Sequence, residues 1–300
     1  MPRPLLLDVD TGVDDAIAIA LASRLAEHAL VAVSTVAGNV PVEDATRNTL
    51  DVLGRLDVDV PVYRGNSLPL SRPLHTAREH HGAAGLGSWA IPSSGRREED
   101  ESAPEAIIRL ARSHAGEITF VFTGPLTNLA VALSLEPRLV EWVPRLVIMG
   151  GAFYARGNVS EHAEFNIYAD PEAAARVANS GMRVTWVGLD VTHQTLLRRA
   201  DWDRLGAATA PAAVLVREVL RRSFEELGRP SFPMHDPLAV AVAELPALVE
   251  LEQGAVRIDV GEPRRGESRV GAAFANDASG AVANQVDVTG FDSMFQRLLG

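Results

Sequence analysis

The sequence of 300 residues contains no cysteine and no lysine. The absence of cysteine excludes disulfides, thiolate nucleophiles and zinc bound through sulfur, so any metal must be held by oxygen or imidazole. The absence of lysine excludes Schiff-base chemistry and a P-loop lysine. These two absences remove whole classes of enzyme, and every one of the 28 basic residues is an arginine.

Long apolar runs and an excess of positive charge are also missing. No stretch approaches the roughly 20 apolar residues of a bilayer span, and residues 1–7 lack the regions of a signal peptide. We therefore expect a soluble, cytoplasmic protein without a membrane partner. The net charge of -11 argues against binding to nucleic acid. A small neutral or cationic ligand fits this charge better, although an acidic surface also serves solubility alone.

Short runs rich in Val, Ile and Leu alternate with segments of helical period. The runs predict strands at residues 4–9, 30–36, 60–63, 118–122, 145–149 and 183–188. The segments predict helices at 14–27, 42–56, 104–113, 126–135, 171–179 and 211–227. This alternation predicts an α/β fold with a mostly parallel central sheet flanked by helices, as in a Rossmann-like open sheet. We expect one domain over residues 1–300.

Two regions depart from the alternation. Residues 65–103 read as one long loop, in which the part around His80, His81 and Gly82 is expected at the rim of a site and residues 96–101 on the solvated surface. Residues 251–289 contain shorter alternating runs, which predict a small antiparallel extension before a final helix at 291–299.

Four carboxylates fall within eight residues directly after the first predicted strand: Asp8, Asp10, Asp14 and Asp15. Capping of the turn and of the following helix explains two of them but not all four. Like charges at this density repel unless a cation neutralises them, and several oxygens at a flexible turn suit a hard ion such as calcium. The segment therefore predicts a metal site.

Polar residues also follow the other predicted strands, where ligands bind in open parallel sheets. Asn39 follows the second strand, and its alternative role is that of a turn residue. The Gly-Pro helix start after Thr123 commonly serves geometry, and it would also leave the Thr123 carbonyl free to bind a cation. After Met149 come two glycines and then Asn158, Glu164 and Asn166, a set that suits a polyhydroxylated sugar, and Asp170, which we expect to cap a helix. His235 and Asp236 open a further predicted helix, as a packed turn residue with an N-cap or as an acid or base beside a metal ligand.

Taken in order, these segments resemble the calcium-dependent inosine-uridine-type nucleoside hydrolases. The resemblance rests on DVDTGVDD at 8–15, VAGN ending at Asn39, TGPLTN at 123–128, MGGAF at 149–153, AEFNIYADPEA at 163–173 and HDP at 235–237. It implies hydrolysis of the N-glycosidic bond of a ribonucleoside to free base and ribose, in purine and pyrimidine salvage. The implied cofactor is Ca²⁺, and the implied assembly is a homodimer or homotetramer.

The resemblance also implies a role for each matching residue. Calcium would be held by Asp10, Asp15, the main-chain carbonyl of Thr123 and Asp236, with Asp10 deprotonating the attacking water and Asp8 supporting these ligands. The 2'- and 3'-hydroxyls would contact Asp14, Asn39 and Asn166, and the 5'-hydroxyl would contact Asn158 and Glu164. Met149 would pack beneath the sugar, His81 would lie on the loop over the base, and His235 would protonate the departing base.

The sequence departs from the family pattern in two places, and the second departure leaves the preferred base open. Thr11 stands where many members have proline, which should loosen the turn only slightly because Gly12 is kept. In the segment 222–232, Ser223 and Leu227 stand around the positions where pyrimidine-preferring members carry Gln and Tyr. Two other functions also remain as alternatives. One is a haloacid-dehalogenase-like phosphatase, whose motif Asp8-x-Asp10 matches but whose threonine is replaced by Gly12. The other is a nucleoside-binding sensor without turnover.

Overall fold

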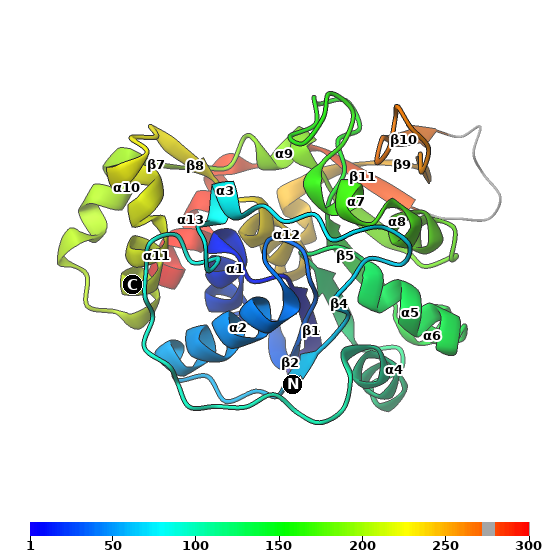
Figure 1. The fold of residues 1–300 in the computed structure, drawn as a ribbon, viewed down its shortest axis with the longest axis horizontal. Helices are drawn as coiled ribbons and strands as arrows, with labels where there is room; N and C mark the ends of the chain where they lie inside the picture. The colour runs from blue at the N-terminus through cyan, green and yellow to red at the C-terminus, as the bar shows by residue number, and fades with distance from the viewer. Residues whose placement is uncertain (272–279, 300) are drawn as a thin grey trace.

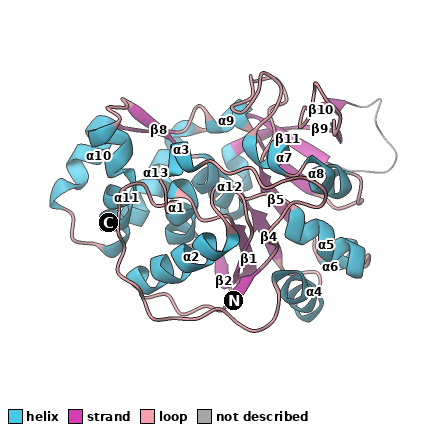
Figure 2. Cartoon of the chain, in the orientation of Figure 1, coloured by secondary structure: helices cyan, strands magenta, loops and turns pink. Residues whose placement is uncertain are grey.

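The computed structural model describes residues 1–271 and 280–299, and a sheet of nine strands forms the centre of this part (Figures 1 and 2). The strands are β1 (Arg3–Val9), β2 (His28–Thr35), β3 (Val62–Arg64), β4 (Thr119–Phe122), β5 (Arg145–Met149), β6 (Val184–Val187), β9 (Val249–Ile258), β10 (Ser268–Gly271) and β11 (Gly280–Val286). Their order is β10-β9-β11-β6-β5-β4-β1-β2-β3. Strands β1 to β6 pair in parallel, β11 adds to β6 in parallel, and β9 is antiparallel to β10 and β11. The predicted parallel sheet and antiparallel extension are confirmed, except that residues 272–279 of the extension lie outside the described residues.

Helices cover both faces of the sheet. They are α1 (Val13–Ala22), α2 (Val42–Leu56), α3 (Arg78–His81), α4 (Ala103–Ser113), α5 (Thr127–Leu135), α6 (Leu139–Trp142), α7 (Phe165–Ala169), α8 (Pro171–Ala178), α9 (Leu189–Thr192), α10 (Arg199–Arg204), α11 (Pro211–Arg221), α12 (His235–Glu244) and α13 (Val288–Leu299). In Figure 1, α1, α2, α11 and α12 lie on one side of β1 and β4, whereas α4, α5 and α8 lie on the other. A separate antiparallel pair joins β7 (Leu196–Arg198) to β8 (Ser231–Pro233).

Alternate side chains of the central strands enter two separate cores. Leu5 and Leu7 of β1 belong to the core under α1 and α12, whereas Leu6 belongs to the core under α4 and α5. Successive side chains of a strand point to opposite faces, and a strand buried on both faces therefore reads as a continuous apolar run. This explains why β1 is visible in the sequence as an uninterrupted apolar segment.

The first predicted helix is longer than the helix observed. α1 ends at Ala22, whereas the periodicity predicts helix as far as residue 27. The chain leaves the helix because Glu244 of α12 accepts hydrogen bonds from the main-chain N–H groups of Ala26 and Glu27, at 2.9 and 2.8 Å. A contact between residues so far apart in the sequence leaves no trace in local periodicity.

The long segment 65–103 contains one short helix, α3, which the sequence did not predict. Its His-Gly part borders the site described below, as expected, and residues 96–101 are exposed or half-buried. The latter part runs along the edge of the sheet, where the N–H of Glu99 donates to the carbonyl of Val62 at 2.8 Å. No helix in the described part of the chain is long and apolar enough to cross a bilayer.

The order of the parallel strands fixes the place of the site. Strands β1 and β4 are adjacent and parallel. From β1 the chain continues to β2 and β3 on one side of this pair, whereas from β4 it continues to β5 and β6 on the other side. Open parallel sheets bind ligands outside the carboxyl ends of the strands at such a switch point. Asp10 and Asp15 follow β1, and Thr123 follows β4, so all three lie at this point.

Candidate active site

One cavity of about 590 Å³ lies over the carboxyl ends of the strands. It is lined by eleven of the residues singled out in the sequence: Asp14, Asn39, His80, His81, Thr123, Met149, Asn158, Glu164, Asn166, His235 and Asp236. These residues come from segments spread over more than two hundred positions of the chain. The fold therefore brings together what the sequence places only at separate strand ends.

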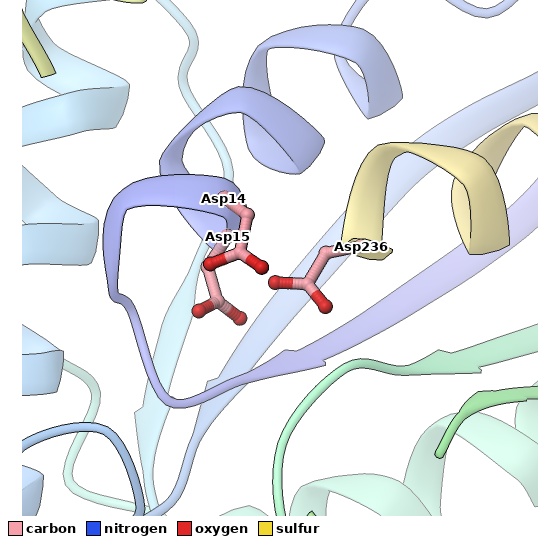
Figure 3. A group of neighbouring side chains, drawn as sticks. All are labelled: Asp14, Asp15 and Asp236. Atoms are coloured by element: carbon pink, nitrogen blue, oxygen red, sulfur yellow. The ribbon is translucent and has the colours of Figure 1, made fainter. Parts of the chain in front are cut away.

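Three carboxylates meet at the floor of the cavity. Oxygens of Asp14, Asp15 and Asp236 lie within 4.8 Å of one another, and all three residues are buried (Figure 3). Asp14 and Asp15 come from the first turn of α1, and Asp236 comes from the first turn of α12. The resemblance implies a contact between Asp14 and the sugar, and the carboxylate of Asp14 lies beside those of Asp15 and Asp236.

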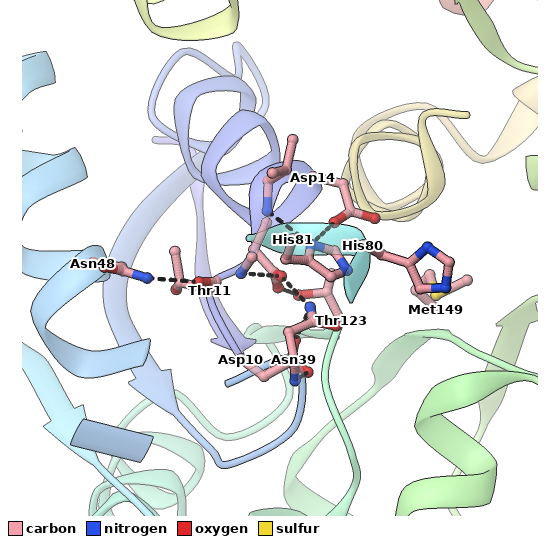
Figure 4. A network of polar contacts seen from close by, with 12 residues as sticks. Asp10, Thr11, Asp14, Asn39, Asn48, His80, His81, Thr123 and Met149 are labelled. Atoms are coloured by element: carbon pink, nitrogen blue, oxygen red, sulfur yellow. Dashed lines mark hydrogen bonds and ion pairs between the residues drawn. The ribbon is translucent and has the colours of Figure 1, made fainter. Parts of the chain in front are cut away.

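Asp10 lies beneath the cavity lining and not in this group of three. Its Oδ2 accepts from the N–H of Asn39 at 2.7 Å and its Oδ1 accepts from Nδ2 of Asn39 at 3.1 Å (Figure 4). The same Nδ2 donates to Asp15 Oδ2 at 3.1 Å. Asn39 thus bridges two carboxylates, in addition to lining the cavity. Gly12 permits this arrangement, because a Cβ there would lie 2.8 Å from Nδ2 of Asn39 and would clash with His81.

Burial and mutual repulsion disfavour the charged form of these carboxylates. Burial, with repulsion from Asp15, raises the pKa of Asp10 well above its usual range. Burial, with repulsion from Asp14, likewise raises the pKa of Asp236 far above normal and that of Asp15 above normal. Burial raises the pKa of Asp14 to about 6. A bound cation would reverse these shifts, because it offsets the lost hydration of each carboxylate.

The three carboxylates of Asp14, Asp15 and Asp236 have the chemistry to bind a hard divalent cation. Every candidate ligand atom is an oxygen, as calcium prefers. Oδ1 of Asp14 is buried and has no hydrogen-bond partner among the described residues, which is costly unless a ligand completes its contacts. Thr123 also lines the cavity, and its carbonyl accepts from Nδ2 of Asn166 at 2.6 Å.

The predicted 5'-hydroxyl residues lie on the loop after β5 and at the start of α7. Glu164 is 2% exposed and caps α7, and it accepts from the N–H groups of Gly151, Asn166 and Ile167 at 3.2, 2.8 and 3.1 Å. Burial raises the pKa of Glu164 to about 7. Asn158 is exposed and lines the cavity. The expected cap at Asp170 is confirmed, since its Oδ1 accepts from the N–H of Ala173 at 3.1 Å.

The two histidines singled out in the sequence are held differently. His81 lies on α3, where its Nδ1 accepts from the N–H of Val13 at 3.1 Å and lies 3.7 Å from Oδ1 of Asp14 (Figure 4). Burial lowers the pKa of His81 to about 4. His235 pairs its Nδ1 with the hydroxyl of Thr192 at 2.7 Å, and burial lowers the pKa of His235 to about 3. Nδ1 of each ring is therefore engaged by the protein.

Several cavity residues were not singled out in the sequence. They are His75, Ala77, Glu79, Val159, Phe165, Tyr168, His193, Arg229, Phe232 and Pro233. His193 follows β6 within a few residues, so the rule that polar groups after strands form the site would have found it. Ser223 and Leu227 do not line the cavity, whereas Arg229 and Phe232 of the same region do.

The chain matches the family model described as inosine-uridine preferring nucleoside hydrolase over residues 5–293. The chain belongs to this nucleoside hydrolase family. A non-specific ribonucleoside hydrolase of Klebsiella pneumoniae is 40% identical over 97% of this chain and 96% of its own. A pyrimidine-specific ribonucleoside hydrolase of Salmonella typhimurium is 37% identical over 99% of both chains. The solved structure of a purine-preferring ribonucleoside hydrolase from Gardnerella vaginalis superposes with a TM-score of 0.92 at 35% identity, covering 99% of this chain and 98% of that one.

Membership of the nucleoside hydrolase family disfavours the phosphatase alternative, and the surroundings of Asp8 agree. Oδ2 of Asp8 accepts from the hydroxyl of Ser34 at 2.5 Å and from Nδ2 of Asn128 at 2.8 Å, and the residue is fully buried below the cavity. Burial raises the pKa of Asp8 to about 7. A carboxylate in this position supports the turn after β1 and has no access to a phosphoryl group.

Proposed function

We propose that this chain is a calcium-dependent ribonucleoside hydrolase, with its single catalytic domain over residues 1–300. The observation that carries the proposal is the cavity itself, in which sugar-binding polar groups, a histidine and a buried carboxylate group converge at one switch point. Asp14 lines this cavity, and its Oδ1 is buried without a hydrogen-bond partner among the described residues, so a bound cation would complete its contacts.

We assign the cation to Asp10, Asp15, the carbonyl of Thr123 and Asp236, with Asp14 at its edge. When bound, calcium would lower the pKa of a nearby water and draw ribose hydroxyls to the cavity floor. The protein's own contribution is to hold these oxygens in place. Asn39 does so by bridging Asp10 and Asp15, and Thr123 does so by donating its hydroxyl to Oδ1 of Asp15 at 2.8 Å.

Asp10 is the proposed general base. Its two hydrogen bonds from Asn39, at 2.7 and 3.1 Å, fix its orientation, so that its carboxylate can accept the proton of the attacking water. As water adds to C1' of the ribose, its proton passes to Asp10. The ribosyl group develops positive character in the transition state, and the surrounding carboxylates favour that charge.

The ribose is held by groups around the floor of the cavity. Asp14, Asn39 and Asn166 are assigned to the 2'- and 3'-hydroxyls, and Asn158 and Glu164 to the 5'-hydroxyl, with Met149 packed beneath the sugar. Asn166 is fixed in this role because its Nδ2 donates to the carbonyls of Thr123 and Met149 at 2.6 and 3.2 Å. A site with this many aligned polar groups selects for a fully hydroxylated sugar.

His235 is assigned to the leaving base. A proton moves from its imidazole to a ring nitrogen of the base as the C1'–N bond breaks, and the bonding electron pair stays with the base. Burial keeps the free imidazole neutral at neutral pH, so the proton that His235 passes to the base must be taken up from solvent when the substrate binds. A neutral resting state is consistent with a group that acts only when the base closes the cavity. His81 borders the same cavity beside Asp14.

Removal of the cation tests the proposal. Chelation should abolish release of the base, and added calcium should restore it. Because the pKa of Asp14 is raised to about 6 and those of Asp10, Asp15 and Asp236 are raised as well, protons compete with the cation as the pH falls. Below pH 6, the calcium concentration for half-maximal activity should rise by about tenfold per pH unit for each proton released. Full activity in protein shown by elemental analysis to be metal-free would overturn the assignment.

Loss of the 2'-hydroxyl should be strongly unfavourable. A 2'-deoxyribonucleoside leaves Asp14 and Asn166 without their partner in a closed polar site. Sites built to bind a hydroxyl reject the analogue that lacks it by roughly 10⁴–10⁵ in kcat/KM. The measurement compares ribo- and 2'-deoxyribonucleosides that carry the same base. Comparable kcat/KM values for the two sugars would contradict the proposed contacts with the ribose.

A further inference from the structure

Thr192 is in direct contact with His235, the proposed acid, and the sequence did not predict this contact. It ends α9, the short helix after β6, and is fully buried. Its hydroxyl lies 2.7 Å from Nδ1 of His235 and forms no other hydrogen bond within the described residues 1–271 and 280–299. A buried hydroxyl whose single partner is the ring of a site histidine controls how that ring is turned.

The contact determines which nitrogen of His235 is free. With Nδ1 held by Thr192, Nε2 remains on the other side of the ring, and His235 lines the cavity. A hydroxyl can accept a hydrogen bond from Nδ1–H and can also donate one to a bare Nδ1. Thr192 can therefore hold the same ring orientation before and after Nε2 gives up its proton.

Hydrogen bonds also hold α9, the helix that carries Thr192, in place. The carboxylate of Asp190, also in α9, accepts from the N–H groups of Phe153, Tyr154 and Ala155 at 3.0, 2.7 and 2.9 Å. On the other side, the N–H of Met234 donates to the carbonyl of Thr195 at 2.9 Å. Met234 directly precedes His235. These hydrogen bonds therefore hold Thr192 and His235 at a fixed distance from each other.

We propose that Thr192 is a positioning residue that aims Nε2 of His235 at the ring nitrogen of the departing base. The proton on Nε2 passes to the base as the C1'–N bond breaks and its electron pair moves to the base. Nδ1 keeps its own hydrogen, which is donated to the hydroxyl of Thr192. This inference rests on the proposed function, because it assumes that His235 assists the leaving group.

The substitution Thr192→Val removes the hydroxyl at nearly constant volume. We expect it to lower kcat for inosine and uridine by roughly 10–100-fold, the usual loss when the partner that orients a functional histidine is removed. KM should change little. With a nitrophenyl riboside, whose aglycone leaves without protonation, kcat should stay within about twofold of wild type. Thr192→Ser, which keeps the hydroxyl, should restore most of the activity on inosine and uridine.

Two further variants separate positioning from general damage. Thr195 is buried nearby, and its hydroxyl donates to the carbonyl of Thr192 at 3.2 Å without touching His235. Thr195→Val should therefore leave the ratio of rates on inosine and on the nitrophenyl riboside unchanged. If Thr192→Val does not fold, as judged by thermal unfolding, Thr192→Ala takes its place in the comparison with Thr192→Ser.

His235→Ala, measured on the same three substrates, distinguishes failure of the inference from failure of the proposed function. If His235→Ala harms all three substrates equally, the assignment of His235 is wrong, and the inference falls with it. If His235→Ala spares the nitrophenyl riboside but Thr192→Val matches wild type, or slows all three substrates alike, only the positioning role is overturned. Selective loss on inosine and uridine, rescued by serine, supports it.

Discussion

Asp10→Ala should lower kcat/KM by at least roughly 10⁴-fold on inosine and uridine, and equally on a nitrophenyl riboside. Loss of a general base alone costs about 10²–10⁴, and Asp10 is assigned to the cation as well, so the variant loses both functions. The nature of the leaving group does not matter here, because water must be activated whichever group departs. The measurement is kcat/KM for both substrate types at saturating calcium.

A buried aspartate outside the cavity provides the matched control. Asp51 of α2 is 5% exposed and accepts from the N–H of Ser94 at 2.7 Å. Asp51→Asn should leave kcat/KM within about twofold of wild type, since surroundings away from the site rarely alter catalysis. Asp10→Asn keeps the volume of the side chain and should be as inactive as Asp10→Ala. An Asp10 variant that keeps more than a tenth of wild-type activity would remove Asp10 from the mechanism.

His235→Ala should slow hydrolysis of inosine and uridine by on the order of 10²–10⁴, the usual scale of general acid catalysis. The effect should shrink with a nitrophenyl riboside, because that aglycone leaves as a stabilised anion and needs little protonation. Comparison of the two substrates therefore isolates the leaving-group side of the reaction, whereas Asp10 reports on the nucleophile.

The neighbouring histidine is the natural comparison for His235. The ring of His193 lies 5.7 Å from that of His235, between centroids, and borders the same cavity. His193→Ala should not discriminate between the natural nucleosides and the nitrophenyl riboside. If His193→Ala discriminates and His235→Ala does not, the acid is His193. His81 is a weaker candidate for the acid than His193, because its Nδ1 already accepts a hydrogen bond from the N–H of Val13.

Most of the central fold was predictable because its signals are local. The second helix is observed at Val42–Leu56, as its apolar spacing predicts, and Arg145–Met149 forms the predicted strand. Elements set by distant contacts were missed. α3, α9 and the β7–β8 pair are too short to show a period, and the helix from Pro211 ends at Arg221 and continues as a π-helix over Arg222–Glu226.

The site was predictable in composition but not in arrangement. Polar residues after strands identified Asn39, Thr123 and Asn166, because parallel strands end at one edge of the sheet. The sequence contained no sign that Asn39 bridges Asp10 and Asp15, or that Asp14 joins Asp15 and Asp236. These contacts depend on how α1 and α12 pack together, which is decided by the whole core.

The most direct test of the account is the stoichiometry of products from the purified chain with calcium. Free base and ribose are assayed separately after incubation with purine and pyrimidine ribonucleosides and with their 5'-nucleotides. The account predicts release of one base for each ribose from ribonucleosides, with no release of phosphate from nucleotides. Tight binding of intact nucleosides with no base released over hours would identify a sensor, and release of phosphate without base would identify a phosphatase. Either result would contradict the hydrolysis of the N-glycosidic bond proposed here.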